Sequence, residues 1–579
     1  MSAICGVVGP AAAGRVERML AAVDYRGDRS DVVSGRGATL GFRGWAGRPG
    51  KAQGVHTSEE GTLVAVAGTL APPAADPCVE LDGRIRSADW AGLDGAFAAA
   101  RWDGVELTLL RDPFGVRPLY WAQVGDTLWF ASELKQLAQV PELAWDVALE
   151  TIHAWLTFSF VPGATTPIRG VNRLLPGARL RFRDGRVEID RWFELREDVS
   201  SMFADQEQAV RAVRTTAKAA VARRLNGEAE VGVFLSGGLD SSAVAAWLHK
   251  LGQPVHALSL DFGDASVERE QAAAVASALG IRHTWVPADG ARVGASLDAL
   301  VWLLDLPFGD AVTGPQLLLA QAARDLGVRA VFNGEGGDQL FGGWTSKPMV
   351  AAALYGADEG DEEEEYLRSY HRFYGMEDEL YTPALAEAVG GRLRRRELLR
   401  PYLGDDKTSF YLNRVRLADL SLKGCQNILP RAERITNGVG LDMRVPLFDR
   451  ELAELSFRIP PSLKLHGACE KYVLKLAVQG RLPDDVVWRR KFGMSVPVTD
   501  WIFGPRGGSG RGPLYDRVAD ALSAESARRR GWFRPEYLQR LLRGEEAAGE
   551  TRRRRLGEKV WALTMLELWA RRFLDQGRP

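Results

Sequence analysis

The fold is decided by the stretch VGVFLSGGLDSS, residues 231–242. Its apolar first half, Val231–Leu235, is typical of a buried strand, and Asp240–Lys250 has the pattern of a helix. Two glycines between them let the backbone approach an anion closely, and free N–H groups at the helix start supply donors and a favourable dipole. The stretch therefore predicts a phosphate site in an α/β domain.

The same loop indicates which phosphate chemistry is involved. An aspartate in a phosphate cradle is repulsive unless a divalent cation bridges it, so Asp240 predicts Mg²⁺. The order SGGxDS differs from GxxxxGK[ST] and is that of the pyrophosphate loop of enzymes that cleave ATP to AMP and pyrophosphate. The alternative is a Ser/Gly-rich helix entry without a ligand. We assign to the nucleotide Ser236, Gly237, Gly238, Leu239, Asp240, Ser241 and Ser242.

Strands alternate with helices on either side of this loop. Strands are expected at His256–Phe262, Ile281–Val286 and Val328–Phe332, with a helix at Glu268–Leu279. Alternation of this kind predicts βαβ units and a parallel sheet. We add Leu258 and Ser259 to the nucleotide site. After Trp344 the chain is expected to be mostly helical.

A second glycine-rich loop, Phe332–Asp338, leaves a strand and carries two carboxylates. At the carboxyl edge of the sheet it would face the first loop across the ligand crevice. Gly334 is assigned to the nucleotide, and Asp338 is expected to complete the Mg²⁺ site with Asp240. Glu335 is expected to orient a substrate or nucleophile. The alternative is a turn with solvated acids.

The first 195 residues are expected to form a separate, strand-rich α+β domain with antiparallel sheets. The segment Leu195–Gln206 is expected to be a linker, and residues 207–579 a second domain. A helix is predicted at Gly14–Val23. Strands are predicted at Ile4–Val8, Leu63–Val66, Val105–Leu110, Thr127–Ala131, Ala178–Phe182 and Arg186–Ile189.

Composition narrows the class of protein. The chain has 579 residues and a net charge of −1, which argues against dedicated nucleic-acid binding. Its four cysteines lie far apart, which excludes a disulfide framework or zinc module and predicts a reducing cytoplasm. No apolar run reaches ~18 residues, so no membrane span is expected. The charge runs Asp358–Glu365, Arg392–Arg400 and Arg552–Arg555 are expected to be solvated surfaces.

The chain resembles the class B, glutamine-type asparagine synthetase family through motifs in both halves. These are Cys5–Gly9, Tyr25–Asp28, Leu93–Phe97, Arg111–Tyr120, Ala131–Lys135, Ser236–Ser242, Gly334–Gly343, Arg444–Asp449 and Arg490–Gly493. The resemblance implies an N-terminal glutaminase-type domain of the Ntn-hydrolase fold and an ATP-pyrophosphatase synthetase domain. It implies ATP and Mg²⁺, an acyl-adenylate formed from a carboxylate, and an amine that displaces AMP.

The resemblance also assigns further site residues. Lys491 matches the family's lysine that contacts phosphate oxygens, and Glu433 matches a carboxylate that helps deprotonate the amine in some relatives; a structural salt bridge is the alternative for Glu433. The run Leu306–Asp310 lies where the substrate-facing loop is expected. Three aromatic residues could enlarge the pocket or belong to the core, which we favour: Trp302, Phe308 and Trp344.

The glutaminase half departs from the family pattern. The family's nucleophile is an N-terminal cysteine, but Cys5 follows Met-Ser-Ala-Ile, so it is interpreted as a vestigial residue. The glutamine-binding Asn-Gly-Glu segment is Ala67-Gly68-Thr69 here. The expected arginine is replaced around Gly44-Trp45, and the segment Ala71–Gly92 is shortened. Each change removes a contact to glutamine.

The leading hypothesis is an ATP-dependent ligase that joins a carboxylate to an amine whose nitrogen does not come from glutamine. Relatives with a silent glutaminase domain include β-lactam synthetases and lasso-peptide cyclases, so the substrates could be small molecules or a peptide. Alternatives are a glutamine-hydrolysing asparagine synthetase and a catalytically silent scaffold. A homodimer or a biosynthetic partner protein is compatible with the sequence, and neither nucleic acid nor membrane is expected as a partner.

Overall fold

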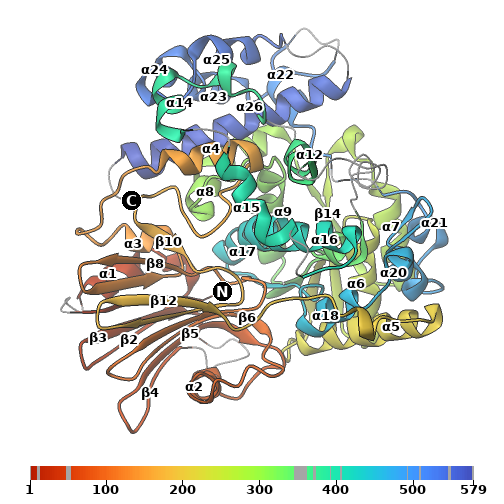
Figure 1. Cartoon of the computed structure of the whole chain (residues 1–579). Coiled ribbons are helices and arrows are strands. Elements are labelled where there is room, and N and C mark those ends of the chain that lie inside the picture. Colours follow the sequence, from red (N-terminus) through yellow and green to blue (C-terminus); the bar gives the residue numbers. More distant parts are fainter. Residues whose placement is uncertain are drawn as a thin grey trace.

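The computed structural model describes residues 2–9, 14–46, 54–343, 361–369, 373–390, 393–403, 407–491, 493, 495–506, 510–545 and 550–576. Figure 1 shows two stacked sheets of strands on one side of the molecule and a third sheet surrounded by helices beside them. The C-terminal helices form a further layer at the top of that view. Trp344, the start of the acidic run (358–360) and Arg392 lie outside the described residues.

The N-terminal part contains two six-stranded antiparallel sheets. In order, the first sheet consists of β10 (Val171–Arg173), β8 (Tyr120–Val124), β9 (Thr127–Ala131), β1 (Ala3–Val8), β3 (Ala38–Gly44) and β2 (Arg29–Gly35). The second consists of β12 (Arg186–Arg191), β11 (Ala178–Arg183), β7 (Leu107–Arg111), β6 (Gly95–Trp102), β5 (Leu63–Leu70) and β4 (Gly54–Thr57).

Alternating side chains of these strands fill a core between the sheets and two outer layers. Along β1, Ile4 and Val8 face the core between the sheets, whereas Cys5 and Val7 face the outer helices. The first sheet packs against α1 (Gly14–Ala21), α3 (Leu134–Leu137) and α4 (Leu149–Phe158), and the second against α2 (Pro77–Ser87). The predicted antiparallel sandwich is confirmed.

The second part is built on a five-stranded parallel sheet. Its order is β15 (Arg282–Pro287), β14 (Val255–Asp261), β13 (Val231–Phe234), β16 (Ala330–Phe332) and β17 (Asp442–Arg444). The chain runs from β13 outward to β15 and then returns to the other side of β13. Ligands of such sheets bind where the direction of winding reverses, which here is between β13 and β16.

Helices cover this sheet and complete the C-terminal part. Around the sheet lie α5 (Gln206–Arg223), α6 (Leu239–Lys250), α7 (Arg269–Leu279), α8 (Gly290–Leu304), α9 (Thr313–Asp325) and α10 (Gly337–Phe341). Then follow α12 (Asp361–Ser369), α13 (Glu377–Leu380), α14 (Pro383–Val389), α15 (Leu393–Leu403), α16 (Tyr411–Ala418), the π-helix η4 (Asp419–Ile428), α17 (Leu429–Gly438), α18 (Arg450–Phe457), α19 (Pro461–Lys464), α20 (Tyr472–Val478) and α21 (Asp484–Val487). The last are α22 (Val498–Phe503), α23 (Tyr515–Ala521), α24 (Ala524–Arg530), α25 (Pro535–Leu542), α26 (Glu550–Ala570) and η5 (Arg571–Asp575). The predicted α/β fold with a mostly helical C-terminal part is confirmed.

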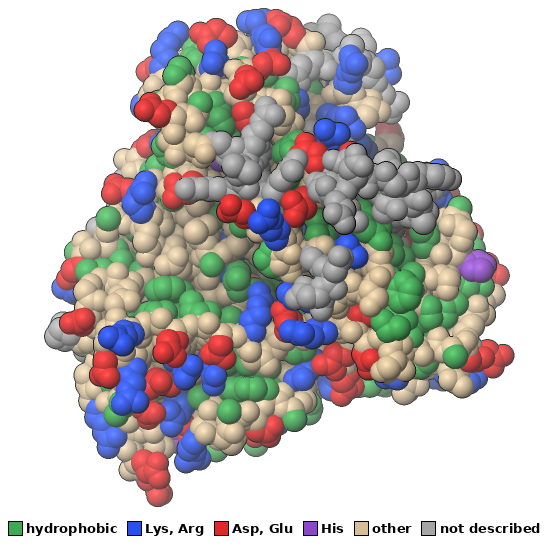
Figure 2. Space-filling view, viewed as in Figure 1, with side chains coloured by type: hydrophobic (Ala, Val, Ile, Leu, Met, Phe, Trp, Pro, Cys, Tyr) green, Lys and Arg blue, Asp and Glu red, His purple; other side chains and the backbone are tan. Residues whose placement is uncertain are grey.

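The distribution of surface charge is relevant to nucleic-acid binding, and the length and polarity of the helices are relevant to membrane insertion. On the described residues of the face in Figure 2, basic and acidic side chains are interspersed. Among the helices that the structure describes, none is both long and apolar enough to cross a membrane.

Candidate active site

Two loops meet at the point where the winding of the parallel sheet reverses. The first follows β13 and opens α6, with Gly238 as the N-cap, and the second follows β16 and opens α10. A Cβ atom at Gly334 would overlap the backbone of Asp240 and Ser241. The two loops therefore approach to backbone contact, which only glycine permits at this position.

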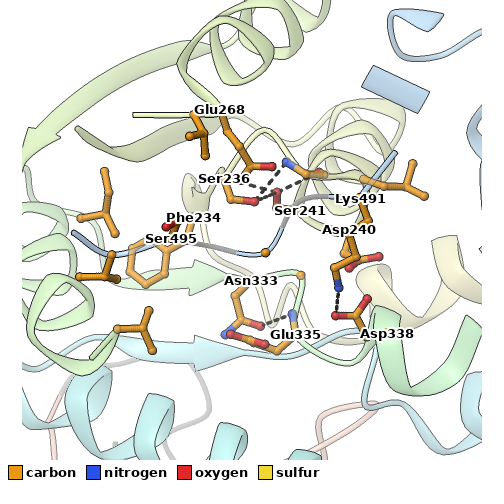
Figure 3. Close-up of a pocket in the computed structure, with 18 of the residues that line it drawn as sticks. Phe234, Ser236, Asp240, Ser241, Glu268, Asn333, Glu335, Asp338, Lys491 and Ser495 are labelled. Carbon is orange, nitrogen blue, oxygen red and sulfur yellow. Dashed lines mark hydrogen bonds and ion pairs between the residues drawn. The ribbon is translucent and has the colours of Figure 1, made fainter. Parts of the chain in front are cut away.

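A cavity of about 1400 Å³ opens at these loops. Figure 3 shows the serines of the first loop near Glu268, with Asn333 and Glu335 on the second loop. Among the residues assigned from the sequence, the cavity is lined by Ser236, Gly238, Leu239, Asp240, Ser241, Leu258, Ser259, Gly334, Glu335, Asp338 and Lys491. The assigned residues that do not line it are Gly237, Ser242, Glu433 and Cys5.

Hydrogen bonds within the first loop fix the hydroxyls of Ser236 and Ser241. The Ser236 and Ser241 Oγ atoms lie 3.1 Å apart, and the Gly238 N–H donates to Ser236 Oγ (3.2 Å). Gly237 has φ = +80°, and its Cα packs against the start of α7. The Ser242 side chain is fully buried on the inner face of α6. Gly237 and Ser242 thus shape the loop, while Ser236 and Ser241 face the cavity.

The second strand contributes Leu258 and Ser259 to the floor of the cavity. The Ser259 hydroxyl donates to the Leu235 carbonyl and lies 2.7 Å from His283 Nε2. These bonds tie β14 to the residue before the phosphate loop and to β15. Through these bonds Ser259 anchors the residue before the phosphate loop to β14 and β15.

Two aspartates and two lysines form a chain of ion pairs at one end of the cavity. Lys471 Nζ pairs with Asp240 Oδ2 and lies 2.6 Å from Asp338 Oδ1. Lys491 pairs with the other oxygen of Asp338. Asp240 comes from the first loop and Asp338 from the second, so Lys471 joins the two loops.

The pKa values of the two aspartates shift in opposite directions because their surroundings differ. Burial would raise the pKa of Asp338, but Lys471 and Lys491 outweigh it and hold that pKa well below its ordinary range. Burial raises the pKa of Asp240, against the effect of Lys471, and the charge of Asp338 adds to the rise. Although burial would lower the pKa of Lys471, the two carboxylates raise it. Lys471 and Asp338 are therefore firmly charged.

The two aspartates fit a magnesium ion that is also held by phosphate oxygens. Asp240 Oδ1 is buried and accepts no hydrogen bond, so one oxygen of the pair remains available. Mg²⁺ is usually bound by one or two carboxylates together with substrate phosphates. Among the described residues, no group of three or more acidic, histidine or cysteine side chains gathers as a metal site. Asp240 and Asp338 would hold Mg²⁺ together with the phosphate oxygens of a bound nucleotide.

Glu335, on the same loop as Asp338, and a fixed ion pair also line the cavity. Burial raises the pKa of Glu335, against Arg431, and the charges of Asp338 and Asp240 add to the rise. Arg431 pairs with Asp310, which also accepts a hydrogen bond from Asn427 Nδ2 (2.9 Å). A carboxyl with a raised pKa is a stronger base than an ordinary carboxylate, which suits it to accept a proton.

Glu433 lies at the interface between the two parts of the chain and is fully buried. Its Oε1 accepts hydrogen bonds from Arg26 Nη1 (2.5 Å), Arg117 Nη1 (2.9 Å) and Asn437 Nδ2 (2.6 Å). Despite burial, which would raise it, the arginines hold the pKa of Glu433 well below its usual range. Of the two interpretations left open by the sequence, the structural salt bridge is the one that this geometry matches.

Cys5 is fully buried in the middle of β1, between β3 and β9. Its Sγ faces the Val16 carbonyl of α1 at 3.8 Å, and burial raises the pKa of its thiol. By contrast, Ser2 Oγ accepts a hydrogen bond from the N–H of Gly68 (2.9 Å), in the segment that corresponds to the family's glutamine-binding loop. The side chain at that loop is thus Ser2, and Cys5 lies on the other face of the strand.

Of the three aromatic residues weighed as pocket or core, Trp302 and Phe308 belong to the core, and Trp344 lies outside the described residues. Phe308 is buried, and Trp302 stacks on Phe573 with 6.0 Å between the ring centroids. Neither lines the cavity. Asp310 is the residue of the expected substrate-facing loop that reaches the cavity wall.

Sequence reasoning missed Lys471, the lysine that pairs with both aspartates. Its backbone is left-handed (φ = 54°), which is uncommon for a residue with a side chain and is found mostly at functional sites. Lys471 lies 130 or more residues from either loop, so no local pattern links it to them. Its only sequence signal is a charged pair, Glu470-Lys471, before an apolar helix.

Comparisons with known proteins cover both parts of the chain. The family model described as asparagine synthase matches residues 212–571, and that described as a glutamine amidotransferase domain matches residues 87–193. Asparagine synthetase (glutamine-hydrolyzing) 1 of Bacillus subtilis is 26% identical over 506 residues, covering 82% of this chain and 77% of that protein. Asparagine synthetase (glutamine-hydrolyzing) 3 of the same organism is 30% identical over 429 residues, covering 69% and 67%. Amidase chry2 of Gibberella zeae is 26% identical over 512 residues, covering 76% and 74%.

Proposed function

We propose that this chain adenylates a substrate carboxylate and joins it to an amine that does not come from glutamine. The premise is that the chain belongs to the asparagine synthase family and is an ATP-dependent carbon–nitrogen ligase. The observation that carries this proposal is the contrast between its two halves. The phosphate loops, both aspartates and both lysines line one cavity, whereas Cys5 is a fully buried residue of β1.

The first step is attack by a carboxylate oxygen on the α-phosphorus of ATP. The bond from that phosphorus to its bridging oxygen breaks, and pyrophosphate leaves with the electron pair. Ser236 and Ser241 bind phosphate oxygens, while Lys471 and Lys491 offset the charge that develops on the leaving group. Mg²⁺, when held by Asp240 and Asp338, supplies further charge neutralisation to the phosphates.

The second step is attack by the amine on the acyl carbon, which expels AMP. The attacking nitrogen loses a proton, and Glu335 is the carboxylate we assign to accept it. Burial raises the pKa of Glu335, which brings its basicity closer to neutral pH. Glu433 is not assigned this role, because its oxygens are occupied by Arg26, Arg117 and Asn437 outside the cavity.

The substrate is proposed to be larger than a free amino acid, as in natural-product amide ligases or peptide macrolactam formation. Support comes from the cavity, which at about 1400 Å³ exceeds the range of about 300–1,000 Å³ that is usual for one small ligand. Such a volume suits ATP together with a bulky acyl group. The four cysteines are free, which agrees with a reducing cytoplasm as the proposed location.

A second candidate is a glutamine-hydrolysing asparagine synthetase. It is favoured by the names of the two Bacillus subtilis relatives, both of which specify glutamine hydrolysis. The experiment that separates the candidates measures AMP and pyrophosphate released from ATP with a panel of carboxylic acids. Each acid is tested with glutamine, with ammonia and with primary amines. Our proposal expects release with amines and no gain from glutamine; release that requires glutamine would favour the second candidate.

A further inference from the structure

Asn427 presents a buried amide on the wall of the cavity. The residue is 4% exposed and lines the cavity. Its Nδ2 donates to Asp310 Oδ2 (2.9 Å), whereas its Oδ1 accepts no hydrogen bond from any residue that the structure describes. Because an ionised carboxylate can only accept hydrogen bonds, the amide nitrogen must face Asp310, and this fixes the position of the oxygen. The oxygen is therefore a fixed acceptor that a ligand can satisfy.

The backbone that carries Asn427 is the π-helix η4. Helices of this type are rare and frequently lie at functional sites. The neighbouring Gln426 holds the helix in place, because its Oε1 accepts a hydrogen bond from the Gly163 N–H (2.7 Å) and its Nε2 donates to the Ser421 carbonyl (2.9 Å). Both ends of the Gln426 amide thus serve the fold, whereas only the nitrogen of the Asn427 amide does.

Printed contacts link Asn427 to Glu335, the carboxylate assigned to accept a proton. Asp310 joins Asn427 to Arg431, because it accepts a hydrogen bond from the first and pairs with the second. Arg431 in turn acts on Glu335, whose pKa is raised by burial and lowered by the charge of Arg431. All four residues line the cavity, and Glu335 lies on the loop after β16 (Figure 3). Asn427 therefore belongs to the same group of side chains as Glu335.

The charge next to the amide oxygen is already balanced. Arg431 pairs with Asp310, and the Asn427 amide carries no charge. A neutral N–H donor can therefore satisfy this buried acceptor without adding a charge to the group. An amine in its uncharged form is such a donor, and it is also the form whose lone pair can attack an acyl carbon.

We propose that Asn427 Oδ1 accepts a hydrogen bond from an N–H group of the amine nucleophile, so that the enzyme selects primary amines over secondary amines. This inference rests on the proposed function, in which Glu335 accepts the proton that the attacking nitrogen loses.

The number of N–H groups on the amine is the basis of this selection. When a primary amine attacks, the carbon–nitrogen bond forms, the bond from the acyl carbon to the AMP oxygen breaks, and AMP leaves with the electron pair. One N–H proton passes to Glu335, and the other N–H group remains on the amide and stays bonded to Asn427. A secondary amine has a single N–H group, which it must give to Glu335, so its product leaves the Asn427 oxygen without a partner.

The test compares methylamine with dimethylamine as nucleophiles, using the full-length protein, saturating Mg²⁺-ATP and an acid that releases AMP. Mass spectrometry of the amide gives kcat/KM for each amine, referred to the concentration of its uncharged form. Exchange of labelled pyrophosphate into ATP, measured without amine, reports adenylation separately.

Two variants test the assignment to Asn427. Asn427→Leu keeps the size of the side chain and removes its polar atoms, while Asp310 keeps its ion pair with Arg431. The matched control is Gln316→Met. Gln316 is a second amide on the cavity wall whose buried oxygen accepts no hydrogen bond from the described residues, so it is the rival acceptor.

We expect the wild type to prefer methylamine over dimethylamine about tenfold in kcat/KM, which is the effect of one hydrogen bond to a buried acceptor. Asn427→Leu should lose this preference and retain pyrophosphate exchange, and Gln316→Met should keep the preference.

Equal use of the two amines by the wild type would overturn the inference whatever the variants do. A preference that persists in Asn427→Leu, or that is lost in Gln316→Met instead, would also overturn it. Loss of pyrophosphate exchange in Asn427→Leu would do the same, because Asn427 would then be needed before the amine binds. Absence of pyrophosphate exchange in the wild type with every acid would refute the proposed function itself. Normal exchange and amide formation without a preference for methylamine would refute this inference alone.

Discussion

Asp240 and Asp338 lie on separate loops, and the lysines around them divide their roles. Asp338 pairs with both Lys471 and Lys491, whereas Asp240 pairs with Lys471 and keeps one buried oxygen without a hydrogen bond. Asp338 is thus the fixed charge of the site. Asp240 is the residue whose charge depends most on a bound cation, because burial and the charge of Asp338 both raise its pKa.

Removing either charge should stop adenylation without unfolding the protein. Asp240→Asn and Lys491→Ala are each expected to lower kcat for AMP formation by about 10²-fold or more, since such groups act on charge that develops in the transition state. The measurement is AMP release at saturating ATP. Matched controls are Asp264→Asn, on the exposed turn after β14, and Lys250→Ala, at the outer end of α6. Normal AMP release in Asp240→Asn would remove that residue from the site.

The cysteines should differ sharply in reactivity. Burial raises the pKa of Cys5 and Cys425, and it raises that of Cys78 to about 12, whereas Cys469 is only partly buried. Because the thiolate is the reactive form, a limiting alkylating agent should label Cys469 first in the native protein. Peptide mass spectrometry gives the order of labelling. We expect Cys5→Ala to leave AMP formation unchanged. Early labelling of Cys5 would contradict its placement inside β1.

Among the secondary-structure elements, the sequence predicted the strands in which apolar and polar side chains alternate and the strands that are short apolar runs. Thr127–Ala131 was predicted with the bounds observed for β9, and Val231–Leu235 exceeds β13 by one residue. By contrast β6, Gly95–Trp102, is rich in alanine, which does not favour strands, and it is a strand because both of its faces are covered. β17, Asp442–Arg444, has charged ends, of which Asp442 pairs with Arg117 of the first part of the chain and Arg444 pairs with Asp442. Tertiary contacts of this kind are invisible to a local pattern.

The candidate site, like the strands, could be predicted from local sequence patterns only in part. Its two glycine loops could be read from the sequence, because each glycine and carboxylate is local to a strand end. Which residues of the first loop face the cavity could not be predicted from the sequence, since Ser242 turns inward and Gly237 meets α7 only in the folded chain. The inward face of α26 depends on where Thr499 packs. Long-range packing decides which of several equivalent polar residues reach the cavity.

The contact between α22 and α26 can be tested with a pair of glycines. Gly557→Ala is expected to lower the free energy of unfolding by about 1–3 kcal/mol, because the new methyl group overlaps Thr499. Gly83→Ala in α2 is the control, since nothing lies near its Cβ position. The control should be neutral or stabilising by up to about 1 kcal/mol, as alanine favours helices. Denaturation in urea measures both. A Gly557→Ala variant as stable as the control would contradict the packing.

At the scale of the whole molecule, a buried ionic network joins the two parts of the chain. Arg26 links Glu133 of the first part (2.5 Å) to Glu433 of the second (2.5 Å), and Arg117 reaches Glu433 and Asp442. The motif Arg111–Tyr120 serves this contact, because Asp112 accepts three backbone N–H groups and so shapes the loop that carries Arg117. Much of the family resemblance in the first half thus maps to the interface.

Breaking this network should destabilise the protein in a pH-dependent way. Glu433→Gln is expected to lower the free energy of unfolding at neutral pH by about 3–5 kcal/mol, because Arg26 and Arg117 lose a buried partner. The wild-type network should weaken in acid. Burial would raise the pKa of Glu133, yet Arg26, Lys135 and Arg434 lower it from 4.5 to about 2. A depressed carboxyl pKa stabilises the fold above the unfolded pKa, and that stability is lost as the pH falls from 4.5 toward about 2.

Urea denaturation across this pH range checks both statements. The variant should lose less stability in acid than the wild type, because one low-pKa carboxyl of the network is missing. The control is Glu451→Gln on the exposed side of α18, whose ion pair with Arg223 is largely solvated and contributes little. A wild-type stability that stays constant from pH 4.5 to 2 would contradict the network as described.

In the proposed reaction the amine comes from a source other than glutamine. The most direct measurement supplies an accepted carboxylate, its amine and Mg²⁺-ATP together with glutamine labelled with ¹⁵N in the side-chain amide. Mass spectrometry of the product and an assay for glutamate then follow the nitrogen. We expect an unlabelled amide product and no glutamate formed in step with AMP. A labelled product, with glutamate released in proportion to AMP, would contradict it.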